Sequence, residues 1–228
     1  MEIWCSQELK SFRACQKSCV WRPSPGSPWS TDIWAPELHN LNGTWYIYFA
    51  GAHPKEGNPS HRTLILRSTN PNPMDASSWQ FLGPLRGVPD HWAIDATVFT
   101  LHNSLYCCYS GWPLGDNSDT EQDLFLIRLL SPEEADHSTL VCISKPTLDW
   151  ERLDNRGVNE GPEFLSTPQF TGIIYSANGS WTNKYKLGAL QLVGPDVMSP
   201  GSWRKLERPV MMSDPNEKHG PYGPGHAS

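Results

Sequence analysis

The chain has 228 residues, a formal net charge of −6 and 38% hydrophobic residues. This length is enough to bury a hydrophobic core, and the acidic balance argues against a nucleic-acid partner, which would need clustered Lys and Arg. No apolar run in the sequence approaches the ~20 residues of a membrane-spanning helix, so no membrane partner is expected.

Three residue types are abundant: 11 Trp, 21 Pro and 18 Gly. Pro and Gly interrupt helices and mark turns, so this composition favours many short strands. A Trp excess is typical of all-β cores and also of sites where rings stack on sugars, and composition alone favours the core.

The six cysteines have no CxxC or Cys/His spacing of the kind that binds zinc, so they predict no metal site. Cys107 and Cys108 are adjacent, and on a strand their side chains would point to opposite faces, as packing residues. The first ten residues lack the basic start and apolar stretch of a signal peptide.

Along the chain, residues 1–30 are expected to be the end of an incomplete strand unit, with strand-like residues at 9–12 and 20–21. Residues 31–90 form the next unit, in which strand-like runs alternate with Pro, Gly and Asn turns. Its runs lie at 33–38, 45–50, 63–67 and 79–82.

Residues 91–155 and 156–218 repeat this plan, and residues 219–228 begin it again with a strand expected at 222–226. One short helix is predicted at 132–136. The other predicted strands lie at 94–99, 105–110, 124–128 and 150–153, and then at 159–165, 172–177, 186–190 and 203–206.

Four short strands per unit is the plan of a β-propeller blade. Aligning Trp34, Asp95, Glu160 and Gly223 gives intervals of 61, 65 and 63 residues, by subtraction of the residue numbers. These intervals are longer than the WD40 and kelch periods. A β-sandwich is the alternative fold, but repetition of a whole four-strand unit favours an all-β propeller.

The first strand of each blade lines the central channel, so Trp34, Asp95 and Glu160 are expected to converge there. Glycoside cleavage needs one protonated carboxyl for the leaving oxygen and a second carboxylate. Two close acidic groups raise the pKa of one of them, which keeps that acid protonated. The alternative is that the carboxyls are ordinary surface groups and Trp34 packs in the core.

Four motifs carry a resemblance to a known family, one at the start of each unit. They resemble the inner-strand motifs of glycoside hydrolase family 43. The motifs are Ile33-Trp34-Ala35-Pro36-Glu37, Ile94-Asp95-Ala96-Thr97-Val98-Phe99, Asn159-Glu160-Gly161-Pro162-Glu163 and Gly223-Pro224-Gly225-His226.

The resemblance implies a five-bladed β-propeller that is incomplete in this chain. It implies that residues 1–30 are a remnant of blade one and that residues 219–228 start blade five. Blades two, three and four would then be residues 31–90, 91–155 and 156–218. The front of blade one and most of blade five would be missing.

The resemblance also implies roles for single residues. Glu160 matches the general acid, Asp95 the residue that raises the pKa of that acid and orients it, and Trp34 the wall of the sugar subsite. His226 matches a channel histidine beside a structural calcium or sodium ion, and no other cofactor is required. Trp112, which follows the second strand of its unit, is expected either at the pocket rim, as a substrate-binding residue, or in the core, and Trp181 is in the same situation.

Family members invert the anomeric configuration with a third carboxylate as general base. The acidic residues before Asp32 are Glu2 and Glu8, and neither has the Asp-Pro context that the family uses. We therefore expect the base to precede Met1, which leaves the activity of this chain open.

The function implied is hydrolysis of O-glycosidic bonds in arabinose- or xylose-containing plant polysaccharides. An α-L-arabinofuranosidase is favoured, with arabinan, arabinoxylan or their oligosaccharides as partners. The alternatives are a β-xylosidase of the same fold and a catalytically dead propeller that acts at most as a carbohydrate-binding module. The full-length family member is expected to be extracellular.

Overall fold

The structure is a computed structural model that describes residues 1–8, 15–214, 216 and 218–227. Strands dominate, which confirms the all-β prediction. Among the described residues the helical segments are short 3-10 turns: η1 (Ala76–Ser78), η2 (His137–Thr139), η3 (Asp149–Glu151) and η4 (Pro200–Ser202). None of the helical segments in this part of the chain is long and apolar enough to span a membrane.

The first large sheet is an antiparallel meander in the order β3-β4-β5-β6. Asn42 and Gly43 have φ angles of 53° and 85°, and this left-handed pair closes the two-residue turn between the first two strands. The strands are β3 (Thr31–Leu41), β4 (Thr44–His53), β5 (Gly57–Ser68) and β6 (Gln80–Pro84).

The second group starts with a hairpin whose turn is formed by His102 and Asn103. Their φ angles of 49° and 60° again suit a two-residue turn. β9 is its third strand, and both β10 and β11 pair with β9. The strands are β7 (Ala93–Leu101), β8 (Ser104–Gly111), β9 (Glu121–Ser131), β10 (Glu134–Ala135) and β11 (Val141–Ser144).

The third group has the order β13-β14-β15-β16, with β12 paired to the start of β13. Two parallel pairs, Gly157 with Glu121 and Val158 with Gln122, connect β13 to β9 and so join the second and third groups. The strands are β12 (Arg152–Leu153), β13 (Arg156–Ser166), β14 (Thr171–Ala177), β15 (Lys186–Leu192) and β16 (Trp203–Lys205).

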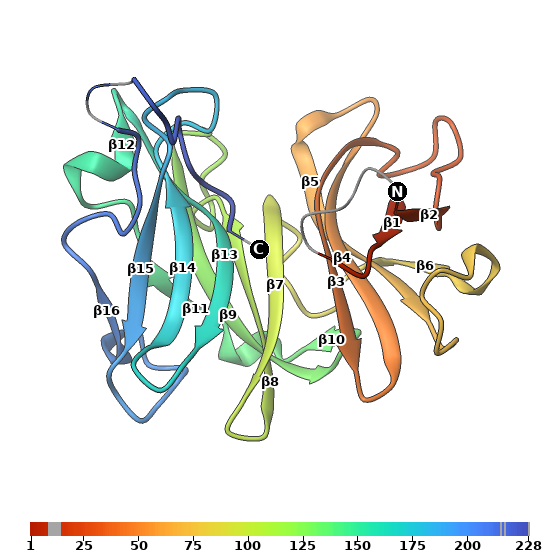
Figure 1. Ribbon diagram of the computed structural model, residues 1–228. Coiled ribbons are helices and arrows are strands. Elements are labelled where there is room, and N and C mark those ends of the chain that lie inside the picture. The colour runs from red at the N-terminus through yellow and green to blue at the C-terminus, as the bar shows by residue number, and fades with distance from the viewer. Residues whose placement is uncertain (9–14, 215, 217, 228) are drawn as a thin grey trace.

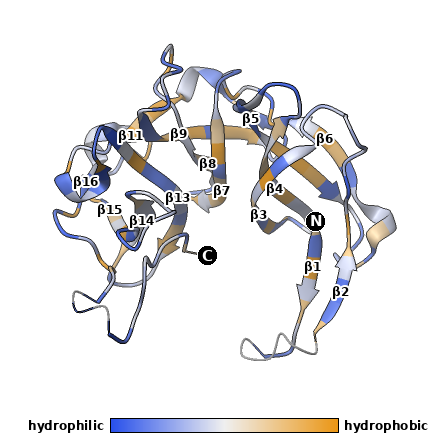
Figure 2. Cartoon of the chain, turned by 90° about the horizontal axis from the view of Figure 1, so that it is seen from above, coloured by the Kyte–Doolittle hydropathy of each residue, from blue (hydrophilic) through white to orange (hydrophobic). Residues whose placement is uncertain are grey.

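The sheets stand side by side along an arc, with β3, β7 and β13 on its inner side (Figure 2). In Figure 1 the strand β7 separates the group β3–β6 from the group β13–β16. A short ribbon of β1 (Glu2–Cys5) and β2 (Gln16–Cys19) precedes the first sheet. The inner strands therefore bring residues more than 60 positions apart to one place.

Hydrophobic cores fill the spaces between neighbouring sheets. Cys107 belongs to the core between the first and second groups, and Cys108 to the core between the second and third. Both thiols are fully buried and free. The prediction that these neighbours point to opposite faces of their strand is therefore confirmed.

Three local predictions are wrong. Residues 132–136 form no helix, because β10 returns there to pair with β9. Of the expected strand at 150–153, the first half lies in η3 and only β12 (Arg152–Leu153) is a strand; it pairs with β13, whereas the strand beside β9 is β11. Residues 222–226 form no strand. The expected strand at 9–12 lies outside the described residues.

Candidate active site

A pocket of about 630 Å³ lies at the inner strands. Its lining includes four residues singled out from the sequence, namely Trp34, Asp95, Glu160 and His226. They come from β3, β7, β13 and the C-terminal segment. The arrangement of the sheets thus brings one ring, two carboxyls and one imidazole to a common cavity.

The sequence alignment of the repeats places Asp95 opposite Trp34 and Glu160, and the structure shows that this alignment is off by one residue. Trp34 pairs with Ala50, Ile94 with Ser110 and Glu160 with Ser176, each just before a break in register. The structural counterpart of Trp34 and Glu160 is therefore Ile94.

A β-bulge explains how Asp95 still reaches the pocket. In each inner strand the residue after the paired position has a left-handed φ: 45° at Ala35, 54° at Asp95 and 52° at Gly161. A bulge adds one residue to the strand and changes the direction of a side chain. Because Asp95 is not a glycine, its left-handed φ is a strained backbone conformation, and the bulge places this strained residue at the pocket.

Glu160 is buried, and the Tyr185 hydroxyl donates a hydrogen bond of 2.8 Å to its Oε1. Burial, followed by the negative charge of Asp95, raises the pKa of Glu160 to about 8, against smaller opposing effects of Tyr185 and Arg156. At neutral pH this carboxyl is therefore protonated and can donate a proton.

Asp95 is also buried, and burial raises its pKa. Two interactions oppose this rise in pKa: the electrostatic effect of the nearby His226 and a 3.0 Å hydrogen bond donated by the Gly161 amide to Oδ2. Burial thus raises the pKa of both members of the pair, and Asp95 also accepts a backbone hydrogen bond that favours its charged form.

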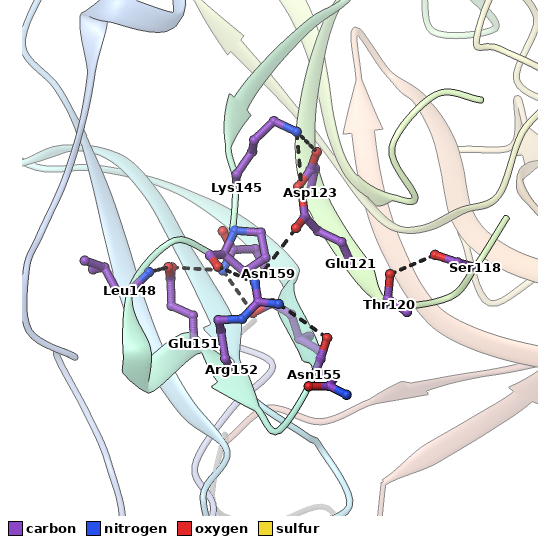
Figure 3. Close-up of polar contacts among 12 residues, drawn as sticks. Ser118, Thr120, Glu121, Asp123, Lys145, Leu148, Glu151, Arg152, Asn155 and Asn159 are labelled. Carbon is purple, nitrogen blue, oxygen red and sulfur yellow. Dashed lines mark hydrogen bonds and ion pairs between the residues drawn. The ribbon is translucent and has the colours of Figure 1, made fainter. Parts of the chain in front are cut away.

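A buried network of hydrogen bonds fixes Asn159, the residue before Glu160. Asn159 donates from Nδ2 to Glu151 Oε1 at 2.9 Å and accepts at Oδ1 from the Ser144 hydroxyl at 2.6 Å. Lys205 donates to the same Glu151 oxygen at 2.6 Å. Figure 3 shows Glu151 and Asn159 facing each other, with the Leu148 amide on the other oxygen of Glu151. The start of β13 is therefore fixed by hydrogen bonds from three elements.

Some tryptophans line the pocket, and others are buried behind the residues that line it. Trp34 is 40% exposed and stacks on the buried His61 with ring centroids 3.9 Å apart. Trp112 is not among the residues that line the pocket: it is 1% exposed and stacks on Trp92 at 4.9 Å. Trp92 lines the pocket instead. Trp112 was expected either at the pocket rim or in the core, and in the structure it lies in the core.

His226 was expected beside an ion. Its backbone amide donates to the Ser176 hydroxyl at 2.6 Å. Within residues 1–8, 15–214, 216 and 218–227, no group of three or more His, Cys, Asp or Glu side chains is arranged to hold a metal ion. The expected ion beside His226 therefore stays a prediction, and no chemical step is assigned to it.

Sequence reasoning missed several pocket residues, among them Trp92, Tyr185 and Arg156. Each belongs to a segment that no repeated motif marks. Tyr185 follows a turn and Arg156 begins β13, so only the folded chain brings them to Glu160.

Comparison with known proteins gives a consistent picture. Residues 1–228 match the family model described as glycosyl hydrolases family 43. An extracellular exo-α-(1→5)-L-arabinofuranosidase of Streptomyces chartreusis is 33% identical over 222 residues, which cover 97% of this chain and 65% of that protein. The α-L-arabinofuranosidase 43 of Humicola insolens is 31% identical over 222 residues, covering 97% and 44%. The chain thus spans 44% to 65% of the length of these two relatives.

Solved structures share the fold. An α-L-arabinofuranosidase from Lactobacillus brevis superposes with a TM-score of 0.88 at 31% identity, over 99% of this chain and 70% of that one. A thermostable family-43 glycoside hydrolase gives a TM-score of 0.70 at 22% identity, over 86% and 61%. The second likeness concerns the fold alone.

Proposed function

The chain belongs to glycosyl hydrolase family 43, and on that premise we propose that the protein is an α-L-arabinofuranosidase acting on arabinose-containing plant polysaccharides. One observation carries the proposal: a buried acid with its pKa raised to about 8, Glu160, lies beside Asp95 in a pocket that Trp34 also lines. The arabinofuranosidases among its relatives favour this activity over that of a β-xylosidase.

In the proposed reaction, Glu160 donates its proton to the glycosidic oxygen as the bond from that oxygen to the anomeric carbon breaks. Asp95 keeps Glu160 protonated by its negative charge and, through the Gly161 amide, holds the backbone next to it. Trp34 forms a wall for the sugar ring. A water molecule attacks the anomeric carbon from the opposite face and loses its proton to a general base, which inverts the configuration.

The general base is not assigned to any described residue. Besides Asp95 and Glu160, one further carboxylate lines the pocket, Asp119. Its Oδ1 accepts a hydrogen bond of 2.6 Å from Arg156, with which it forms an ion pair. Because no described residue is assigned as the base, the second candidate is a propeller that binds carbohydrate without cleaving it.

We extend the proposal to the architecture and location. The sheets beginning with β3, β7 and β13 would be blades two, three and four of a five-bladed propeller, within residues 31–90, 91–155 and 156–218. Residues 1–30 and 219–228 would belong to blades one and five. Two relatives are named as extracellular enzymes, which supports an extracellular location.

The test is hydrolysis of aryl α-L-arabinofuranoside and aryl β-xyloside by the wild type and by Glu160→Gln. We expect faster cleavage of the arabinofuranoside, and a loss of about 10²- to 10⁴-fold in the variant because no proton donor remains. Equal rates for wild type and variant would refute the role of Glu160. Binding of arabino-oligosaccharides without hydrolysis would favour the second candidate.

A further inference from the structure

Two segments of the chain match the acceptor motif for N-linked glycosylation, Asn-x-Ser/Thr with x other than Pro: residues 42–44 and 178–180. A third segment, Asn58-Pro59-Ser60, is excluded by its Pro. The proposed catalysis uses neither of the two motifs. Because so short a motif also occurs by chance, the surroundings of each asparagine decide whether a glycan fits there.

Asn42 lies at the exposed tip of the hairpin that connects β3 and β4. With Gly43 it forms the left-handed turn, whose backbone turns the side chain away from the sheet. The amide group of Asn42 makes no hydrogen bond to any described residue. Its Nδ2 atom is therefore open to a reagent that approaches from solution.

The surface beside Asn42 has space for a sugar. Asn42 lines a cavity of about 790 Å³ together with the polar residues Asn103, Ser104 and Arg128, whose side chains can hydrogen-bond to sugar hydroxyls. The hairpin ends of β3–β4 and β7–β8 that form this cavity lie at the lower end of the molecule in Figure 1. Trp34 is eight positions before Asn42, which at about 3.3 Å per residue places the turn roughly 25 Å from the catalytic pocket. A glycan at Asn42 therefore leaves the catalytic pocket open.

Asn178 has the opposite surroundings. It is 3% exposed and directly follows β14. Its Nδ2 donates to the carbonyl oxygens of Trp150 at 3.3 Å and Arg152 at 2.7 Å, and its Oδ1 accepts from the Gly179 amide at 2.9 Å. Both amide hydrogens are thus in use at a buried position. A sugar on this nitrogen would replace one of them and leave a buried carbonyl without its partner, which is costly.

We propose that Asn42 is a site of N-linked glycosylation and that Asn178 is not. The donor is an oligosaccharide attached to a membrane lipid through pyrophosphate. A bond forms between Asn42 Nδ2 and the anomeric carbon of the donor sugar as the bond from that carbon to the pyrophosphate oxygen breaks. The amide loses one proton, and the lipid pyrophosphate is the leaving group. The inference rests on the extracellular location in the proposed function, because a chain meets this donor during export.

The experiment is peptide mapping of the full chain, fused to a secretion leader and expressed in yeast. Protein from the medium and from the cells is digested with peptide N-glycosidase in water labelled with heavy oxygen, which converts a glycosylated Asn into a labelled Asp. Mass spectrometry then locates the label, and the N-terminal peptide without the leader verifies entry into the secretory pathway. We expect the label at Asn42 in most molecules and none at Asn178 in the secreted protein.

Two variants make the result specific. Thr44→Val removes the hydroxyl that the motif needs but keeps the Asn-Gly turn and a β-branched residue on β4, so it should lose the label at Asn42. It also controls for spontaneous deamidation of Asn42, which Gly43 promotes equally in wild type and variant. Ser180→Thr keeps a complete motif at Asn178, and it should add no label there in the secreted protein. Circular dichroism of each variant verifies its fold.

An unlabelled Asn42 in protein that has lost its leader would overturn the proposal. Label at Asn178 in the secreted protein, or equal label at Asn42 in wild type and Thr44→Val, would also overturn it. None of these measurements depends on hydrolysis, so they are separable from the catalytic proposal. Label at Asn42 in a protein that cleaves no glycoside would refute catalysis and keep the glycosylation site, and cleavage by a protein without the label would do the reverse.

Discussion

At the scale of single residues, two buried carboxyls of the pocket have raised pKa values but different hydrogen-bond partners. Burial is the largest cause of the raised pKa at both positions; at Asp95 a hydrogen bond from the Gly161 amide opposes it, whereas at Glu160 the negative charge of Asp95 adds to it. Because their surroundings differ, the proposed roles differ too: Glu160 as the proton donor and Asp95 as the group that raises its pKa.

This difference predicts how the stability of the protein depends on pH. The pKa of Glu160 is about 8 in the folded state and about 4.5 without the fold. Between these values the folded state holds a proton that the unfolded chain releases, so the free energy of unfolding should fall as pH rises from about 4.5 to about 8. In Glu160→Gln this contribution is absent, and urea unfolding at several pH values should give a shallower decline.

Tyr185→Phe is the matched variant for this titration. It removes the hydrogen bond that favours the ionised form of Glu160, so the decline should extend to higher pH than in the wild type. Parallel pH profiles for the wild type and Glu160→Gln would show that Glu160 does not titrate in this range.

At the scale of elements, the start of β13 depends on η3 and β16. Glu151 is fully buried in η3 and accepts hydrogen bonds from Asn159, Lys205 and the Tyr175 hydroxyl. Such a network specifies one arrangement of these elements when every member has a partner, and it is costly when one is lost.

We predict that Lys205→Met destabilises the protein by about 3–5 kcal/mol, because it leaves the buried Glu151 carboxylate without its ion-pair partner. The double variant Lys205→Met/Glu151→Gln should recover part of this loss, since it removes the uncompensated charge. Chemical denaturation of the wild type, Lys205→Met, Glu151→Gln and the double variant gives the coupling energy. A double variant at least as unstable as the sum of the two single variants would contradict the prediction.

At the scale of the whole molecule, stability comes from the cores between neighbouring sheets. β9 contributes to both cores through alternate residues, for example Leu126 toward one and Ile127 toward the other. Each sheet therefore buries both faces only when its neighbours are in place.

Two leucines on β9 test this arrangement. Leu126 is fully buried, and Leu126→Ala should lower the free energy of unfolding by about 2–5 kcal/mol because it leaves a cavity between the sheets. Leu130, on the same strand, is 63% exposed, and Leu130→Ala should have an effect within about 0.5 kcal/mol. Similar losses for both variants in thermal or urea unfolding would contradict a core at this place.

Much of the fold could be predicted from short stretches of sequence. Alternating apolar residues and the Asn-Gly turn at 42–43 locate the strands and hairpins of the first sheet, and adjacency alone predicts opposite faces for Cys107 and Cys108. The misassigned outer strand at 150–153 has the same pattern as a true strand. Residues 149–151 instead form a 3-10 turn from which Glu151 accepts a hydrogen bond of the distant Asn159, a contact that a local pattern does not contain.

The sequence by itself determined which residues recur at the start of each strand unit, and so indicated Trp34, Asp95, Glu160 and His226 as candidates for one site. Only the tertiary structure decided that Asp95 reaches the pocket from a bulge one residue out of register. It also decided that Trp92 lines the cavity while Trp112 supports it, and that Tyr185 and Arg156 meet Glu160. Local patterns depend on neighbours along the chain, whereas bulges, stacking and buried hydrogen bonds depend on contacts between sheets.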